Sequence, residues 1–250
     1  MTTAASAPGF RPDMLPRVLE TETLDHLAPD DPVAQRSRRD LRRVNAFMGA
    51  RRILARAMAR ALGDSPPRPL RILELGCGDG RLLLDVARHG GDRWRGARLD
   101  LLDRQPIVDE ATLAGFTAAG WQAHPVIADV MDWASADDGE HWNLIVANLF
   151  LHHFDAASLA RLLSACARRA DAIAACEPRR SRFALAASHL IFFLGANAVT
   201  RNDGVLSVRA GFFDRELAAA WPKGDASWRV DEYDDGLFTH CLVAARGRTT

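Results

Sequence analysis

The sequence predicts an α/β protein built on a doubly wound, mostly parallel seven-stranded sheet with a C-terminal antiparallel hairpin and an N-terminal helical cap. First, residues 71–89 combine a short apolar run, a glycine-rich turn and a helical pattern. Second, later strand-like runs alternate with helical patterns, as in parallel βαβ units. Third, the last two runs are joined by Asp234-Asp235-Gly236, which is a hairpin signal.

The apolar periodicities place the elements in chain order. Strand-like runs occupy 71–75, 97–102, 121–128, 142–147, 173–176, 228–233 and 237–245. Helical patterns follow the glycine turn at 81–89 and recur at 109–119, 156–169, 182–198 and 213–221.

The chain divides into three parts by composition. Residues 1–31 are rich in Ala, Pro, Thr and Asp, which predicts a loose N-terminal arm. Residues 32–69 carry helical periodicity with a break at Gly49, which predicts a helical cap or lid. Residues 70–250 form the main domain, with a helical insertion on its substrate side at about 179–212.

Composition excludes several classes of function. Lys+Arg and Asp+Glu both number 32, so nothing indicates a nucleic-acid partner. The apolar stretch 183–199 is interrupted by Ser188, His189 and Asn197, so we expect no membrane span. The cysteines lack zinc-like spacing, which favours free thiols in a cytoplasmic protein and no metal site; they are Cys77, Cys166, Cys176 and Cys241.

The turn after the first strand reads Glu74-x-Gly76-x-Gly78-x-Gly80. Glycines let a backbone approach a ligand closely, and the N–H groups of the following helix point into the turn. A dinucleotide fingerprint requires its third glycine at position 81, where Arg81 stands. A glycine-rich connection without a ligand is the alternative.

This spacing resembles the E/D-x-G-x-G-x-G motif of class I S-adenosylmethionine (SAM) methyltransferases. The sheet closed by a terminal hairpin resembles the Rossmann-like fold of the same family, and the resemblance covers roughly residues 70–246. It implies SAM as the cofactor. It also implies cofactor contacts by Glu74, Gly76, Cys77, Gly78 and Gly80.

Two acidic positions follow later strands. Asp103, followed by Arg104, ends the second strand, where a carboxylate can accept hydrogen bonds from ribose hydroxyls; Asp100 is a competitor, and a surface or capping role is the alternative. In the family that the sequence resembles, the position of Asp129 accepts a hydrogen bond from the adenine amino group, and that of Val130 packs on the ring. A simple turn residue is the alternative for Asp129.

The stretch Asn148-Leu-Phe-Leu-His-His-Phe154 follows the fourth strand and resembles the N-x-x-L-H-H stretch of small-molecule methyltransferases. Ligands of open α/β sheets bind at the carboxyl ends of strands, so we expect Asn148 and Leu149 to border the cofactor. His152 and His153 are candidate catalytic bases, with His153 preferred and oriented by Asp155. A pocket-shaping or bracing role for the histidines is the alternative.

We expect four residues to contact the acceptor. Arg179 follows the fifth strand and suits a carboxylate or phosphate. His189 and Phe193 belong to the apolar segment that could line a cavity, and Arg43 belongs to the predicted cap. Solvated surface positions and an ordinary buried helix are the alternatives.

Together these features predict a SAM-dependent methyltransferase of secondary metabolism. Its partner is a small-molecule acceptor, and O-methylation of an aromatic or polyketide-like compound is the preferred reaction. The chain is compatible with a homodimer. A non-catalytic accessory or regulatory protein with the same fold is one alternative, and a nicotinamide-dependent oxidoreductase is another.

Overall fold

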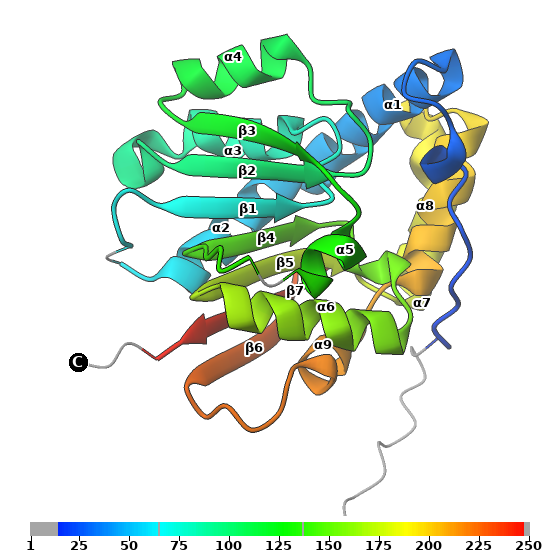
Figure 1. Cartoon of the computed structure of the whole chain (residues 1–250). Helices are drawn as coiled ribbons and strands as arrows, with labels where there is room; N and C mark the ends of the chain where they lie inside the picture. Colours follow the sequence, from blue (N-terminus) through cyan, green and yellow to red (C-terminus); the bar gives the residue numbers. More distant parts are fainter. Residues whose placement is uncertain (1–14, 65, 137, 248–250) are drawn as a thin grey trace, which may run out of the picture.

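The computed structural model describes residues 15–64, 66–136 and 138–247, and its centre is one seven-stranded sheet (Figure 1). The strand order is β3-β2-β1-β4-β5-β7-β6, in which β1 to β5 run parallel and β7 is antiparallel to both of its neighbours. The strands are β1 Arg71–Leu75, β2 Arg98–Asp103, β3 Gln122–Ile127, β4 Leu144–Asn148, β5 Ala172–Pro178, β6 Trp228–Asp235 and β7 Thr239–Arg246. The predicted fold class is confirmed.

The central strands are largely apolar, and helices cover both faces of the sheet. Successive side chains alternate between two cores: Ile72 packs with one helical layer and Leu73 with the other. The first layer contains α2 Ala50–Leu62, α3 Arg81–His89 and α4 Glu110–Ala118. The second layer contains α5 Val130–Ser135, α6 Ala156–Arg169 and α9 Glu216–Ala220, and Figure 1 shows it in front of the sheet.

The N-terminal helices break where the sequence predicts. Gly49 has φ of +73°, ends α1 Pro32–Met48 and begins α2. Only glycine adopts this left-handed conformation without a steric cost. The break turns α1 away from the sheet, so that α1 reaches over the carboxyl ends of the strands.

The predicted long helix 182–198 is wrong. The segment forms α7 Arg182–Ser188 and a 3-10 turn, His189–Leu194, followed by Gly195 at φ of +76°. A separate helix that periodicity did not reveal, α8, then spans Ala198–Ala210. Asn197 begins it, because its side-chain oxygen accepts a hydrogen bond from the Thr200 N–H at 2.8 Å. The helix predicted at 213–221 is also shorter, at Glu216–Ala220.

The predicted loose arm is wrong for residues 15–31; its residues 1–14 lie outside the described part. Residues 15–27, here called the strap, lie along α8 (Figure 1). The Asp203 carboxylate accepts hydrogen bonds from the N–H groups of Thr23 and Leu24, both at 2.9 Å. Arg17 donates to the carbonyls of His152 at 3.1 Å and Phe154 at 3.0 Å. Composition could not reveal these partners, which lie far along the chain.

We predict that Asp203→Ala releases the strap. Asp203 is buried, and its loss removes a charged acceptor from two backbone N–H groups, a change of about 1.5–3 kcal/mol in local stability. Trypsin should therefore cut after Arg17 at least tenfold faster, while the rest of the domain stays protected. Asp225→Ala, which removes an exposed carboxylate beside Ser227, is the control. An unchanged cleavage rate in Asp203→Ala would contradict this anchoring role.

Candidate cofactor and acceptor site

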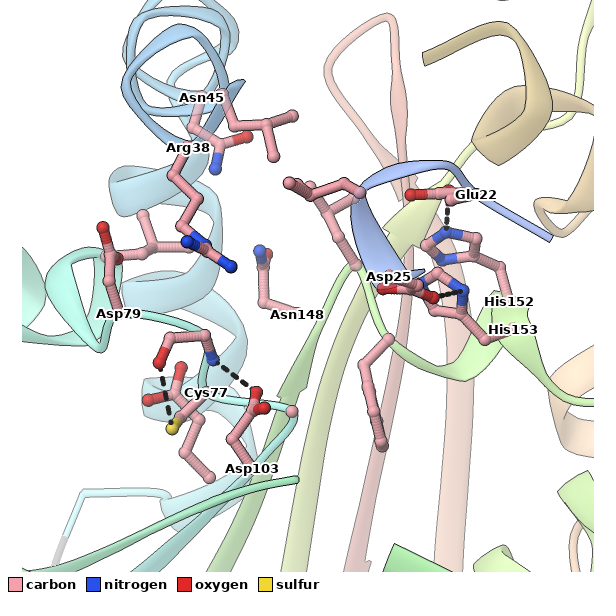
Figure 2. Close-up of a pocket in the computed structure, with 18 of the residues that line it drawn as sticks. Glu22, Asp25, Arg38, Asn45, Cys77, Asp79, Asp103, Asn148, His152 and His153 are labelled. Carbon is pink, nitrogen blue, oxygen red and sulfur yellow. Dashed lines mark hydrogen bonds and ion pairs between the residues drawn. The ribbon is translucent and has the colours of Figure 1, made fainter. Parts of the chain in front are cut away.

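A cavity of about 1030 Å³ lies at the carboxyl ends of the central strands, between α1 and the strap. This volume reaches the top of the ~300–1,000 Å³ that a single small-molecule site usually has, so it leaves room for two ligands. In Figure 2, Cys77 and Asp103 lie on one side of the cavity and His152 and His153 on the other, with Asn148 between them. We call residues 74–79, 102–105 and 128–131 the glycine side, and residues 149–154 with the strap the histidine side.

The glycine turn shapes its side of the cavity. Gly76 and Gly78 both have positive φ, +63° and +56°. A Cβ on Gly76 would lie 2.1 Å from the Phe150 ring, whereas a Cβ on Gly78 would meet nothing within 4 Å. Gly76 therefore allows close packing, and Gly78 keeps the cavity wall open. Gly80, expected at the cofactor, is not on the wall; its N–H bonds the Cys77 carbonyl at 2.9 Å as α3 begins.

Asp103 joins the end of β2 to the glycine turn. Its carboxylate accepts hydrogen bonds from the N–H groups of Gly78 and Gln105, both at 2.9 Å (Figure 2). Burial raises the pKa of Asp103, and the two backbone donors oppose that shift. The competitor Asp100 lies off the wall and accepts from the Trp142 Nε1–H at 2.7 Å.

Three more predicted cofactor residues lie on the wall with different local partners. Arg104 donates to the Asp25 carbonyl at 2.5 Å, so its guanidinium ties the strap to β2. Asp129 caps α5 by accepting from the Met131 N–H at 2.7 Å. Val130 follows it and is buried. Asp129 therefore has a local structural role, like the turn residue that the sequence analysis gave as the alternative. It also borders the cavity.

On the glycine side, the carboxyl group of Glu74 lacks a hydrogen-bond partner for one of its oxygens within the described ranges. It is 4% exposed, and its Oε2 has no hydrogen-bond partner among the described residues. Burial, with the nearby charges of Asp79 and Asp103, raises the pKa of Glu74 to about 8. A buried carboxyl without a donor is costly. It therefore favours a ligand that brings a hydrogen-bond donor or a positive charge to this wall.

The loop after β4 is held in an unusual conformation by a buried carboxylate. Leu149 has φ of +51°, which costs a non-glycine residue about 1–3 kcal/mol unless its surroundings impose it. Glu177, which is fully buried, accepts hydrogen bonds from the N–H groups of Phe150 at 3.1 Å, Leu151 at 2.8 Å and His152 at 3.3 Å. These bonds fix the 3-10 turn Leu151–His153 at the cavity wall.

The two adjacent histidines differ in charge. His152 is 2% exposed, and its Nδ1 lies 2.8 Å from Glu177 Oε2 and its Nε2 3.3 Å from Glu22 Oε1. Burial opposes its protonation, but these two carboxylates prevail and raise the pKa of His152 to about 9. Burial and charged His152 lower the pKa of His153. At neutral pH His152 is therefore an imidazolium and His153 a neutral base.

His153 has a different neighbour from the one predicted. Its Nδ1 lies 3.5 Å from Asp25 Oδ2 on the strap (Figure 2). Asp155, which we expected to orient it, instead caps α6 by accepting from the Ser158 N–H at 2.7 Å. Because the Asp155 carboxylate caps the next helix, its closeness to His153 in the sequence did not predict a contact between the two side chains.

One group of side chains among the described residues could hold a metal ion. Its potential ligand atoms lie within 4.8 Å of one another and belong to Glu22, His152 and His153. Both nitrogens of His152 already lie beside carboxylates, as in a hydrogen-bonded ion pair. Sequence reasoning missed Glu22 because it lies in the stretch that composition marks as loose.

The structure places the four predicted acceptor contacts elsewhere. Arg43 is exposed and pairs with Asp40, and Arg179 pairs with Asp234 at 3.0 Å. His189 is exposed and Phe193 is 78% exposed. None of the four lies on the cavity wall. α7 ends at Ser188, so His189 and Phe193 belong to the 3-10 turn that follows it and not to one continuous helix.

Residues 72–171 match the sequence model of a family described as a methyltransferase domain. Over these residues the chain is similar to methyltransferase domains. A search of curated proteins by sequence gave no match. The matched residues span β1 to the end of α6 and include both the glycine turn and the histidine pair. The match does not point to the nicotinamide-dependent alternative.

Solved structures share the fold of this methyltransferase domain. A plantazolicin methyltransferase in complex with S-adenosylhomocysteine (SAH) is 12% identical with a TM-score of 0.62, and the match covers 87% of this chain and 91% of that one. An O-methyltransferase family protein from Burkholderia thailandensis is 18% identical with a TM-score of 0.57, over 87% of this chain and 61% of that one. The pyocyanin biosynthetic protein PhzM is 19% identical with a TM-score of 0.53, over 87% and 59%.

The residues of the glycine side fit SAM. The open wall at Gly78, the accepting carboxylate of Asp103 and the orphaned Glu74 face one cavity. These groups suit a ligand with hydroxyls and a positive charge. None of the helices in the described ranges has the length and apolar character that crossing a bilayer requires.

We predict that Asp103→Ala weakens SAH binding about ten- to a hundredfold, because hydrogen bonds to a charged acceptor contribute about 1.5–3 kcal/mol. The same change removes the partner of the Gly78 N–H and loosens the turn. Asp100→Ala is the matched control on the same strand: its affinity should stay normal while its stability falls. Isothermal calorimetry measures both. Equal affinities for the two variants would remove Asp103 from the cofactor site.

Proposed function

We propose that this methyltransferase domain methylates a hydroxyl group of a small aromatic or polyketide-like molecule in secondary metabolism. The observation that carries the proposal is a neutral, partly exposed histidine, His153, across the same cavity from the glycine side. The printed names of the structural neighbours support small-molecule chemistry: a plantazolicin methyltransferase, an O-methyltransferase family protein and a pyocyanin biosynthetic protein.

The glycine side is the proposed cofactor site. Glu74 takes the ammonium group of the methionine portion, because its carboxyl lacks a donor. Asp103 accepts from the ribose hydroxyls with its remaining lone pairs. Asp129 and Val130 border the adenine. Asn148 and Leu149 border the methionine portion at the junction of the two sides.

The histidine side and α1 are the proposed acceptor site. Apolar side chains gather on this part of the wall: Leu24, Leu41, Phe47, Phe150 and Phe154. These apolar side chains suit the faces of an aromatic ring, and polar side chains on the same part of the wall, among them Arg38, Arg42 and Asn45, suit its polar substituents. We propose that α1, within the predicted cap 32–69, is the lid over this half.

Bound SAM supplies an electrophilic methyl group on a sulfonium. In such a displacement the acceptor oxygen would take the methyl carbon, and the sulfur would keep the electron pair of the broken carbon–sulfur bond. His153 removes the hydroxyl proton, which it can hold because it is neutral beforehand. The remaining wall aligns the two molecules and keeps water away, which is the larger contribution expected for a displacement with a neutral leaving group.

Two further parts of the proposal concern the setting. The four cysteines are free and buried, which suits a reducing cytoplasm. A homodimer remains a prediction from the sequence.

Incubation with labelled SAM and matched phenols, anilines and carbon nucleophiles tests the function. Label should enter the phenols and not their O-methylated analogues. Transfer only to the anilines or carbon nucleophiles would overturn O-methylation.

We predict that SAH binding at pH 7 releases a proton from Glu74. Its pKa of about 8 leaves the free carboxyl largely protonated, and a nearby ammonium favours the ionised form. The affinity should therefore rise with pH and level off above about 8. Calorimetry in buffers of different ionisation enthalpy measures the release. Glu74→Gln should show neither the release nor the rise. A wild-type affinity that does not change between pH 6 and 8.5 would contradict the assignment.

We predict that His153→Ala lowers kcat by about 10² to 10⁴ and leaves SAM affinity nearly intact. The pKa of His153 is lowered, so wild-type activity should persist at neutral pH and fall only as acid protonates the ring. The deficit of the variant should shrink at high pH, where a phenol ionises without help. His141→Ala, which changes an exposed histidine, is the control. Parallel loss of SAM binding would make His153 a structural residue.

A further inference from the structure

The strap carries a largely buried acid, Glu22, that faces the histidines. The Glu22 side chain is 14% exposed and lies on the cavity wall. It accepts a hydrogen bond from the Ser207 hydroxyl on α8 and lies 3.3 Å from His152 Nε2. Burial raises the pKa of Glu22, but the bond to His152 prevails and the net shift is downward, so the group is ionised. A buried charge of this kind requires a partner.

Glu177 and Glu22 bind opposite nitrogens of the same imidazole. Glu177 lies at Nδ1 and comes from β5, whereas Glu22 lies at Nε2 and comes from the strap. Two carboxylates around one imidazolium leave this three-residue group, Glu177–His152–Glu22, with one net negative charge. The two carboxylates fix the orientation of the His152 ring, since neither ring nitrogen can turn away without losing a charged partner.

His153 stacks against this group. The His152 and His153 ring centroids are 4.2 Å apart, with the planes inclined by 33°. The charged groups that face His153 are His152 of the same turn, Glu177 of β5, and Glu22 and Asp25 of the strap. When His153 takes a proton, it becomes a second cation beside His152. Glu22 and Asp25, both on the strap, supply the negative charge that offsets this repulsion.

We propose that Glu22 is a positioning residue of the methyl-transfer reaction, and that the docked strap completes the active site by bringing this carboxylate to the histidine pair. The inference rests on the proposed role of His153. Glu22 touches neither proposed reactant in this role; it acts by holding His152 in place and in its charged form, beside the base.

Glu22→Gln tests the proposal, because it keeps the size of the side chain and removes its charge. The nitrogen-15 NMR signals of labelled histidines, assigned with a His152→Gln variant, report the charge of His152 directly. In the wild type both nitrogens should stay protonated past pH 8. In Glu22→Gln the ring should lose its proton at lower pH, since one of its two carboxylate partners is gone. With the phenol best methylated by the wild type, kcat should fall about ten- to a hundredfold and the KM for SAM should not change.

Two further variants separate positioning from simple strap docking. Glu22→Asp keeps the charge and should restore part of both kcat and the His152 titration. Arg209→Gln removes the exposed ion pair with Glu20, 3.1 Å long, that also ties the strap to α8. It should leave kcat and the His152 titration at wild-type values.

Several outcomes would overturn the proposal. These are an unshifted His152 titration in Glu22→Gln, a wild-type kcat in that variant, or wild-type activity that EDTA removes and zinc restores. The last would make the cluster a metal site. The NMR measurement needs no acceptor, so a failure of the proposed function is recognised separately, by a wild-type protein that methylates no phenol in the panel.

Discussion

The Glu177 carboxylate is the constraint on which the histidine side depends. It is buried at the end of β5 and accepts three consecutive backbone N–H groups and one ring nitrogen from the loop after β4. Both oxygens of this carboxyl group are used, and its loss would leave several buried donors unpaired at once. The left-handed Leu149, the turn Leu151–His153 and the orientation of His152 all follow from this one group.

The strap extends this network across the cavity. Its Glu22 lies beside the second ring nitrogen of His152, and Arg17 donates to the carbonyls of His152 and Phe154. Arg180, only 2% exposed, donates to the Leu15 carbonyl at 2.7 Å and to both oxygens of Glu216. The strap is therefore held by charged and directional bonds instead of an apolar face. Such contacts specify one docked position, because any other position would leave buried polar groups without partners.

The sequence was most informative where partners are close in the chain. The parallel sheet was predicted from alternating strands and helices, and the glycine turn, Asp103 and Asp129 lie at or just beyond the ends of three strands, so their common edge could be inferred. The acceptor side could not be inferred in this way. Glu22 and His152 are 130 residues apart, and Ser207 and Glu22 are 185 apart. No local pattern encodes such a pairing, and the polar composition of the strap concealed it.

The acidic groups on the two sides of the cavity differ in whether they have hydrogen-bond or ion-pair partners. This difference is consistent with the proposed roles of the two sides. On the histidine side the acids have partners: Glu177 and Glu22 share His152, and Asp25 lies near both Arg104 and His153. That side is ordered by the protein itself. On the glycine side the Oε2 atom of Glu74 has no hydrogen-bond partner in the described part of the chain, and burial with the nearby Asp79 and Asp103 raises the pKa of this carboxyl to about 8. In the proposed assignment the ammonium group of the cofactor relieves this cost, and part of its binding energy would come from the unpaired carboxyl of the free protein. In the same assignment the acceptor would meet a preorganised wall, where its fit and alignment decide the rate.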